Sequence, residues 1–302
     1  MKKLPAAAVL YGLFALFAVI VPFAVFAPSV SAQAPDYSQL DPRPYEPSTE
    51  PNIDMFISHW NESMPRHTHG SLIERDILTR LDGDPLKPEK RGAVLEYLSK
   101  FTYATLAAKN STTPNILSGE QYVFYAVSGH GEISAGGKTG GLYDGVGVLM
   151  PPGIEYTITN TGDSPLNMYI IGENTAADFV PNTEMLVRDE NVMPINYSSG
   201  HWSNIHTQLF RPEDGFSTIS GMGPVWYAPM TICQPHTHSA GNEECWFALE
   251  GDITVLLGKQ IRKLPPGTGF KNPPSGKHPY GPINNTDSMI KLFYVGAPIS
   301  RH

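Results

Sequence analysis

The chain has 302 residues, of which 41% are hydrophobic and 17% charged, and its formal net charge at pH 7 is −8. A chain of this length can bury one or two sizeable cores, and we expect two. The acidic balance and the lack of a basic run give no electrostatic reason to expect a nucleic-acid partner.

The first 32 residues have the pattern of an export signal. Lys2 and Lys3 precede an uncharged run from Leu4 to Val30, which ends in the small-x-small pattern Val30-Ser31-Ala32 of a signal-peptidase site. The run is longer than an ordinary secretory core, so an uncleaved membrane anchor is the alternative to residues 1–32 as a signal peptide. Either interpretation places the folded part in the periplasm or outside the cell, and a membrane contact is expected only for the anchor.

An internal duplication divides the rest of the chain. Ser58-His59-Trp60 recurs as Gly200-His201-Trp202, and the run from Ile158 to Gly172 recurs from Ile283 to Gly296. Both halves are short β-branched and aromatic runs separated by Gly and Pro, which predicts all-β barrels or sandwiches, with one helical pattern at residues 89–100. The expected parts are a proline-rich linker, a first barrel and a second barrel, at residues 33–54, 55–190 and 191–302.

Three histidines and one glutamate in the second half have the spacing of a metal site. His236-Thr237-His238 is followed by Glu244 and then by His278. Side chains two positions apart on a strand point to the same face, so His236 and His238 can bind one ion. Three imidazoles and one carboxylate hold a divalent metal and leave open positions for a substrate.

This pattern resembles the cupin family of small β-barrels. The family's first motif runs His-x-His, a short gap, Glu, six residues and Gly, and its second ends in Pro-x-Gly-x-x-His. They fall at residues 236–251 and 267–278, with Ser275 at the place of the second motif's last Gly, so the turn before His278 is expected to be rebuilt locally. The gap after His238 is longer than the family's, so Glu243 is a rival ligand, although the spacing to Gly251 favours Glu244. The resemblance implies an all-β chain of two tandem jelly-roll cupin barrels, with one metal held by His236, His238, Glu244 and His278.

The first barrel keeps the second motif but has lost the metal ligands. Tyr156 stands at the position of the ligand histidine, and an alignment from Tyr103 and Tyr227 places Thr112 and Pro114 opposite the two histidines of the first motif. Only Glu120 is left as a donor, and one carboxylate with a phenol would bind a divalent ion poorly. We therefore expect this barrel to be degenerate and to stabilise the other.

A second histidine pair lies before the first barrel motif. His67-Thr68-His69 and Glu74 also fit the first-motif spacing, but neither a turn glycine nor a second-motif histidine follows. We expect a structural or rim role, with a metal site as the alternative. Cys233 and Cys245 are expected to be buried packing residues, with a disulfide as the alternative.

Strand alternation predicts the residues around the metal. Met230, Ile232 and Gln234 would share the face of His236, and Trp246 that of Glu244. Such a mostly apolar pocket without Lys or Arg suits a small organic molecule, for example an aromatic or enol compound, as the partner. A homo-oligomer is left open.

The family resemblance extends to the chemistry. It implies iron, manganese or copper as the metal and an oxidoreductase of dioxygenase type, in which Glu244, or Glu243 behind it, takes the proton of the substrate. Two alternatives stay open: a redox-neutral decarboxylase, lyase or isomerase, and a metal- or ligand-binding protein without turnover.

Overall fold

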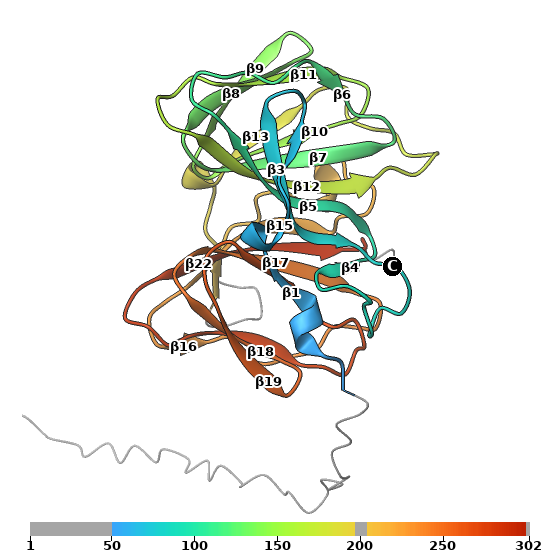
Figure 1. The fold of residues 1–302 in the computed structure, drawn as a ribbon, viewed down its shortest axis with the longest axis vertical. Coiled ribbons are helices and arrows are strands. Elements are labelled where there is room, and N and C mark those ends of the chain that lie inside the picture. Colours follow the sequence, from blue (N-terminus) through green and yellow to red (C-terminus); the bar gives the residue numbers. More distant parts are fainter. Residues whose placement is uncertain (1–49, 197–203, 300–302) are drawn as a thin grey trace, which may run out of the picture. The chain divides into compact units, whose positions relative to one another are not determined.

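The computed structural model describes residues 50–196 and 204–299, and the predicted signal peptide or anchor therefore lies outside the described residues. The described part is built of β-strands and short 3₁₀ helices (Figure 1). None of its helices is long and apolar enough to cross a membrane. The predicted all-β class and the two tandem jelly-roll barrels are confirmed.

The N-terminal barrel consists of an eight-stranded sheet, in the order β13-β10-β7-β12-β5-β3-β2 with β4 beside β3, and a four-stranded sheet, β6-β11-β8-β9. Its strands are β2 (Arg66–Thr68), β3 (Leu72–Arg80), β4 (Ala93–Leu95), β5 (Leu98–Leu106), β6 (Asn115–Ile116), β7 (Glu120–Ser128), β8 (His130–Ala135), β9 (Lys138–Tyr143), β10 (Val146–Met150), β11 (Glu155–Asn160), β12 (Leu166–Asn174) and β13 (Leu186–Asp189).

The C-terminal barrel consists of a six-stranded sheet, β1-β20-β17-β22-β15-β14, and a four-stranded sheet, β16-β21-β18-β19. Its strands are β1 (Ile57–His59), β14 (Asn204–His206), β15 (Gly221–Tyr227), β16 (Thr231–Ile232), β17 (Glu243–Glu250), β18 (Ile253–Leu257), β19 (Gln260–Leu264), β20 (Thr268–Lys271), β21 (Tyr280–Asn284) and β22 (Ile290–Ala297). The 3₁₀ helices are η3 (Ile53–Phe56), η4 (Trp60–Glu62), η5 (Glu190–Val192) and η6 (Pro212–Asp214).

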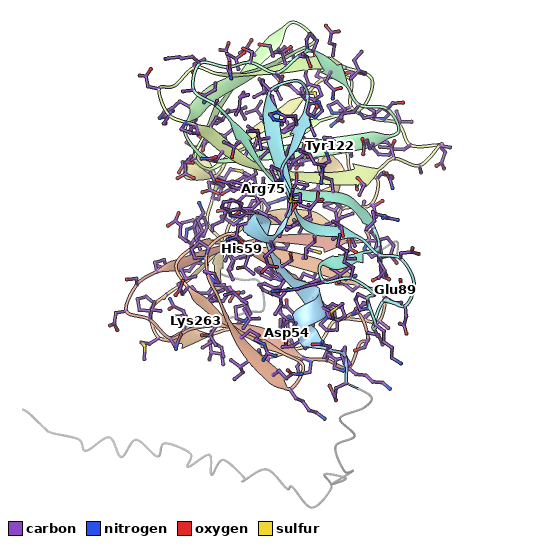
Figure 2. All side chains as sticks on the ribbon, viewed as in Figure 1. Asp54, His59, Arg75, Glu89, Tyr122 and Lys263 are labelled. Carbon is purple, nitrogen blue, oxygen red and sulfur yellow. The ribbon has the colours of Figure 1, made fainter. Side chains whose placement is uncertain are left out.

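The C-terminal barrel contains one strand from the start of the first half of the chain. β1 pairs with β20 of the C-terminal barrel, whereas β13 pairs with β10 of the N-terminal barrel (Figure 1). Ile53 and Ile57 are buried in the core of the C-terminal barrel, and Asp54, labelled in Figure 2, forms an ion pair with Arg262 at 2.8 Å. β1 thus lies within the predicted range 55–190 but pairs in the sheet of the C-terminal barrel, and Ile53, which lies in the predicted linker, is buried in its core.

Three hydrophobic cores follow from the alternation of side chains along the strands. One core fills each barrel, and a third contains residues of both barrels. On β17, Trp246 belongs to the core of the C-terminal barrel, whereas Phe247 belongs to the shared core and stacks on Tyr169 with ring centroids 3.8 Å apart. The central sheet of the C-terminal barrel is therefore covered on both faces, which fixes its register.

Two smaller predictions have clear outcomes. The prediction of a helix at residues 89–100 was wrong, because β4 and the start of β5 occupy this segment, with Val94, Leu95 and Leu98 buried. The expectation for the cysteines is confirmed: Cys233 and Cys245 are both free and buried.

Candidate functional site in the C-terminal barrel

A cavity of about 320 Å³ opens into the C-terminal barrel. Strand β17 contributes Glu244 and Trp246 to its wall, and β21 contributes Tyr280. The remaining lining residues are Asn196, Asn204, His206, Gln208, Val225 and Tyr294. One carboxylate, several amide and imidazole groups and three aromatic rings therefore face the same space, and no Lys or Arg is among these lining residues.

Glu244 is the centre of the polar network at this cavity. Its side chain is 12% exposed, and Oε2 lies 2.7 Å from Nε2 of His238. Oε1 accepts hydrogen bonds from Nε1 of Trp246, at 2.7 Å, and from the hydroxyl of Tyr280. Burial raises the pKa of Glu244, but the hydrogen bonds from His238, Tyr280 and Trp246 outweigh it, so that the net pKa is lowered. Glu244 is therefore an ionised acceptor at neutral pH.

His238 lies beside this carboxylate, and His236 lies beside His238. Their ring centroids are 5.1 Å apart with the planes at 77°, and Nε2 of His238 also lies 3.2 Å from the hydroxyl of Tyr280. His236 forms an isolated bridge with Tyr280, and its Nδ1 lies 2.8 Å from the carbonyl oxygen of Gln234. The hydrogen bond with Glu244 raises the pKa of His238 and outweighs the effect of burial.

His278 does not reach this network. Its Nε2 lies 3.1 Å from Oε2 of Glu50, and its Nδ1 contacts Oγ of Ser275. Tyr280 takes the inward position instead, because it lies four residues before Asn284, as Tyr156 lies four residues before Asn160 in the other barrel. The prediction placed His278 at the ligand position by counting forward from Pro273. This count fails because the turn after Pro273 is rebuilt, whereas counting back from Asn284 identifies Tyr280.

The asparagines justify this count, since each has the same structural role. Nδ2 of Asn284 donates to the carbonyl oxygens of Tyr227 and Ser288, at 2.9 and 2.7 Å. Nδ2 of Asn160 donates to those of Leu106 and Ser164, both at 2.9 Å. Because these bonds fix the end of each strand, the residue four positions earlier has the same orientation in both barrels.

Glu243 lies on the other side of β17 and does not line the cavity. It is fully buried, and it accepts hydrogen bonds from the backbone N–H groups of Glu96, Tyr97 and Leu98. The prediction that Glu243 could be a ligand or a proton acceptor was therefore wrong: neighbouring side chains on a strand point to opposite faces, and only that of Glu244 points into the barrel.

The predicted pocket residues divide into two groups. Trp246 lines the cavity, as predicted. Met230 and Ile232 are 72% and 42% exposed, and Gln234 is exposed as well. Their prediction was wrong because Cys233 points inward, being 1% exposed, and the segment between Cys233 and His236 departs from regular strand alternation.

Besides Tyr280, six pocket residues escaped the prediction because they come from distant elements: Asn196, Asn204, His206, Gln208, Val225 and Tyr294. Asn204 and His206 lie on β14, Gln208 follows it, and Tyr294 lies on β22. His206 pairs with Val225. At the corresponding position of the other barrel, Glu74 pairs with Ala104. No motif of the sequence showed that β14 lies against the cavity.

The donors that meet here fit a metal in chemistry but do not form a preassembled shell. In the described residues, no three His, Cys, Asp or Glu side chains are close enough together to hold an ion. The contact of 2.7 Å between His238 and Glu244 is a hydrogen bond, which a metal would replace. Two imidazoles and one carboxylate are nevertheless a donor set that divalent transition metals accept with positions left open. His236, His238 and Glu244 are therefore the groups that would hold a metal.

The corresponding place in the N-terminal barrel has lost these donors. Tyr156 is opposite Asn115, whose Nδ2 donates to the Tyr156 hydroxyl at 3.0 Å. Tyr122 pairs with Gly172, as Glu244 pairs with Gly296. The prediction that Thr112 and Pro114 correspond to the two histidines was therefore wrong. It was counted from Tyr103 and Tyr227, which do not occupy equivalent positions in the two barrels. The residue at the place of His236 is Asn115.

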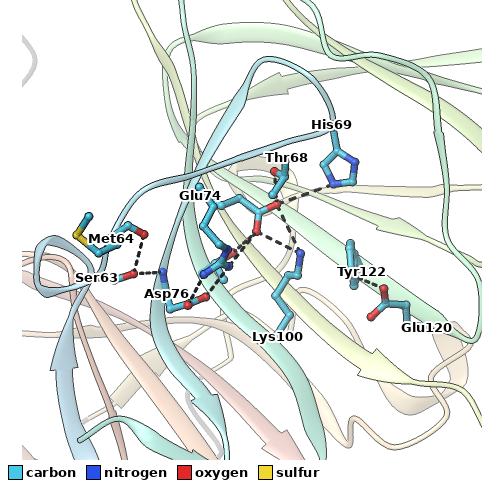
Figure 3. Close-up of polar contacts among 11 residues, drawn as sticks. Ser63, Met64, Thr68, His69, Glu74, Asp76, Lys100, Glu120 and Tyr122 are labelled. Atoms are coloured by element: carbon cyan, nitrogen blue, oxygen red, sulfur yellow. Dashed lines mark hydrogen bonds and ion pairs between the residues drawn. The ribbon is translucent and has the colours of Figure 1, made fainter.

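The second histidine pair splits between the rim and the interior of this barrel. Glu74 is fully buried and contacts Thr68 Oγ1 at 2.7 Å and Lys100 Nζ at 3.1 Å (Figure 3). His69 Nε2 lies 3.9 Å from Glu74 Oε1, whereas His67 is exposed. Glu120 accepts a hydrogen bond from Tyr122 at 2.5 Å. The ammonium group of Lys100 satisfies Glu74, which supports a structural role for it.

Comparisons with known proteins support the fold. No family model and no curated protein matches the sequence. Among solved structures, a putative glyoxylate-induced protein from Pseudomonas aeruginosa is similar, with a TM-score of 0.65, 16% identity and coverage of 82% of this chain and 88% of that one. The bacterial pirin YhhW from Escherichia coli, in complex with nickel(II), has a TM-score of 0.57 and 12% identity, with coverage of 81% and 99%. The 7S globulin of Momordica charantia has a TM-score of 0.57 and 14% identity, with coverage of 82% and 85%.

These similarities define a class of architecture. At identities of 12 to 16% they concern the fold alone. The chain has the fold of a two-barrel cupin, a bicupin, and its candidate site lies in the C-terminal barrel.

Proposed function

We propose that the C-terminal barrel is a metal-dependent oxidoreductase site of dioxygenase type that acts on a small aromatic or enol substrate. The observation that carries this proposal is the contact of His238, which lies beside His236, with Glu244 on the wall of an aromatic-lined cavity of about 320 Å³. A bound iron, manganese or copper ion would supply Lewis acidity and electron transfer between substrate and dioxygen.

The residues of the chain have distinct roles in this proposal. Trp246 and Tyr294, with ring centroids 5.7 Å apart, provide apolar surface for an aromatic ring. Asn204 and Gln208 offer amide groups that orient substrate oxygens. With no cationic side chain among the lining residues, the cavity is suited to a neutral substrate rather than to a dicarboxylate or a phosphate ester.

Glu244 is positioned to accept the substrate proton. Its lowered pKa keeps it ionised; Trp246 and Tyr280 hold Oε1, and His238 holds Oε2. Burial raises the pKa of Tyr280 well above its usual range, as do the charge of Glu244 and its hydrogen bond, so the phenol stays protonated and donates to this carboxylate. The pair Tyr280–Glu244 can therefore hold one proton at the site.

Metal content and oxygen uptake test this proposal. The full chain, purified from its exported fraction, is expected to carry about one transition metal ion per chain and to consume oxygen with phenolic or enol compounds. His238→Ala should remove both properties and His278→Ala neither, which makes the two variants a matched pair. A zinc-loaded protein without oxygen uptake would contradict the dioxygenase and favour a redox-neutral decarboxylase, lyase or isomerase.

A second candidate is a ligand-binding protein without metal and without turnover. It is favoured by Tyr280, which occupies the fourth ligand position and binds Glu244 directly. A preparation without metal that retains a tightly bound small molecule would support this candidate.

The proposal places the site outside the cytoplasm, on the evidence of the sequence pattern in residues 1–32. Fractionation of expressing cells, with N-terminal sequencing of the folded product, tests it. A mature N-terminus close to Gln33 in a soluble exported fraction is expected, whereas an intact leader in the membrane fraction would identify the anchor.

A further inference from the structure

The two barrels are joined by a pair of buried glutamates that have the same task. Glu243 of the C-terminal barrel accepts hydrogen bonds from the backbone N–H groups of residues 96–98, which lead into β5 of the N-terminal barrel. Glu173 of the N-terminal barrel accepts those of residues 217–219, which precede β15 of the C-terminal barrel, all at 2.7 Å. We call these arrangements the Glu243 cap and the Glu173 cap.

Both caps are buried and fully bonded. Glu173 and Glu243 are each 0% exposed. The fourth partner of Glu173 is Nε2 of Gln121, at 2.6 Å. That of Glu243 is Nζ of Lys271, at 3.3 Å. A buried carboxylate that loses such partners is strongly destabilised, so each cap holds its strand in one position against the opposite barrel.

Lys271 extends the Glu243 cap to a third charged group. It is fully buried, and its Nζ lies 2.5 Å from Oε1 of Glu96 and 2.6 Å from the carbonyl oxygen of Val94. Lys271 is on β20, opposite Cys245. The cap therefore ties two neighbouring strands of the C-terminal barrel, β17 and β20, to one segment of the N-terminal barrel.

The caps differ in what lies next to them. The neighbour of Glu243 in the chain is Glu244, whose side chain leaves the same strand on the cavity side, and the carbonyl oxygen of Glu244 accepts a hydrogen bond from the N–H of Asn272 at 3.2 Å. The neighbours of Glu173 are Gly172 and Asn174, and neither lines the cavity. Only the Glu243 cap thus borders the carboxylate at the centre of the candidate site.

We propose that Glu243 is a positioning residue, through which the N-terminal barrel fixes Glu244 and thereby sets the metal affinity of the C-terminal site. The part of this proposal that concerns metal affinity rests on the proposed function, whereas the part that concerns the position of Glu244 does not. This gives the N-terminal barrel a second role, since it also adjusts the site of its neighbour. Glu173 provides a matched control, because it caps the same interface without bordering the site.

The experiment compares Glu243→Gln with Glu173→Gln in the full chain. Both variants are expected to lower the melting temperature to a similar extent. Only Glu243→Gln should weaken binding of Mn²⁺, titrated into EDTA-treated protein, by about 10-fold or more, as changes behind a metal ligand do. Only Glu243→Gln should also shift the indole N–H resonance of Trp246 in the metal-free protein, because that group donates to Glu244.

Glu96→Gln is the milder test if Glu243→Gln fails to fold. The Glu96 side chain is 24% exposed and reaches the cap through Lys271, so this change should shift the Trp246 resonance in the same direction by a smaller amount. Equal shifts in the Glu173 and Glu243 variants, or no shift in the Glu243 and Glu96 variants, would overturn the proposal. If the resonance shifts but wild-type protein binds no Mn²⁺, Glu243 still positions Glu244 and the proposed metal-dependent function fails.

Discussion

The hydroxyl of Tyr280 donates a hydrogen bond to Oε1 of Glu244, so a phenol occupies the position at which the motif leads one to expect an imidazole. Tyr156 has the same position in the N-terminal barrel, where Asn115 is its partner. The two barrels therefore share this tyrosine and differ in what faces it. The candidate site depends on the two histidines of the first motif and on Glu244.

The first prediction concerns the histidines. His238→Ala should weaken binding of Mn²⁺ or Ni²⁺ by about 100-fold or more, because it removes a donor, whereas His278→Ala should change it by less than about 3-fold, because His278 contacts Glu50 instead. Isothermal titration of EDTA-treated protein measures both. Comparable losses in the two variants would show that His278 turns into the site when metal binds.

The second prediction is a pH dependence of the metal-free protein. Glu244 raises the pKa of His238 above 6.5, so this stabilisation is present below 6.5 and is lost as the pH rises through the folded value. The pKa of Glu244 is lowered below 4.5, so its contribution is present above 4.5 and is lost as the pH falls through the folded value.

The pair should therefore stabilise the protein most between about pH 4.5 and 6.5. Melting temperatures in EDTA across pH 4 to 9, for wild type and His238→Gln, measure this. The difference between the two proteins should shrink above pH 6.5 and again below pH 4.5. A difference that is constant over this range would show that the pair does not titrate as the geometry indicates.

The third prediction concerns the hydrogen bond between Trp246 and Glu244. Trp246→Phe removes a donor to an ionised carboxylate, and the coupling free energy between the two side chains should be about 1 to 3 kcal/mol. A double-mutant cycle of Trp246→Phe with Glu244→Gln, by urea unfolding of metal-free protein, gives this value. A coupling near zero would mean that solvent replaces the indole without loss.

The fourth prediction follows from β1, which pairs in the C-terminal barrel although it precedes the N-terminal barrel in the chain. A fragment of residues 191–302 lacks β1 and η3, and with them Ile53, Phe56 and Ile57, all at most 3% exposed in the full chain. It also exposes the face that carries Phe247 and Phe293. It should be insoluble or self-associate, as gel filtration would show, and fusing residues 50–62 to it should restore the sheet but not cover that face. A monomeric fragment that binds metal fully would contradict this.

The sequence determined the parts of the site that local strand geometry controls. His236 and His238 flank one residue, so any strand-like conformation brings them to one face, and Glu244 is separated from Gly251 by the length of one strand. The all-β class and the duplication followed from short β-branched runs between turns. The loss of metal ligands in the first barrel was predicted from Tyr156 in the same way, although the residue at the place of His236 is Asn115 rather than Thr112.

Only the tertiary structure decided the remainder, because it depends on contacts between residues far apart in the chain. Tyr280 rather than His278 points inward since Asn284 fixes the end of β21 through carbonyl groups more than fifty residues earlier in the chain. Glu243 is structural since its partners, at residues 96–98, belong to the other barrel. β1 joins the C-terminal sheet by pairing with β20, more than two hundred residues later in the chain, and Ile57 is buried in the core of that barrel. Motif spacing describes neighbours along the chain, whereas packing between distant strands selects which face each side chain takes.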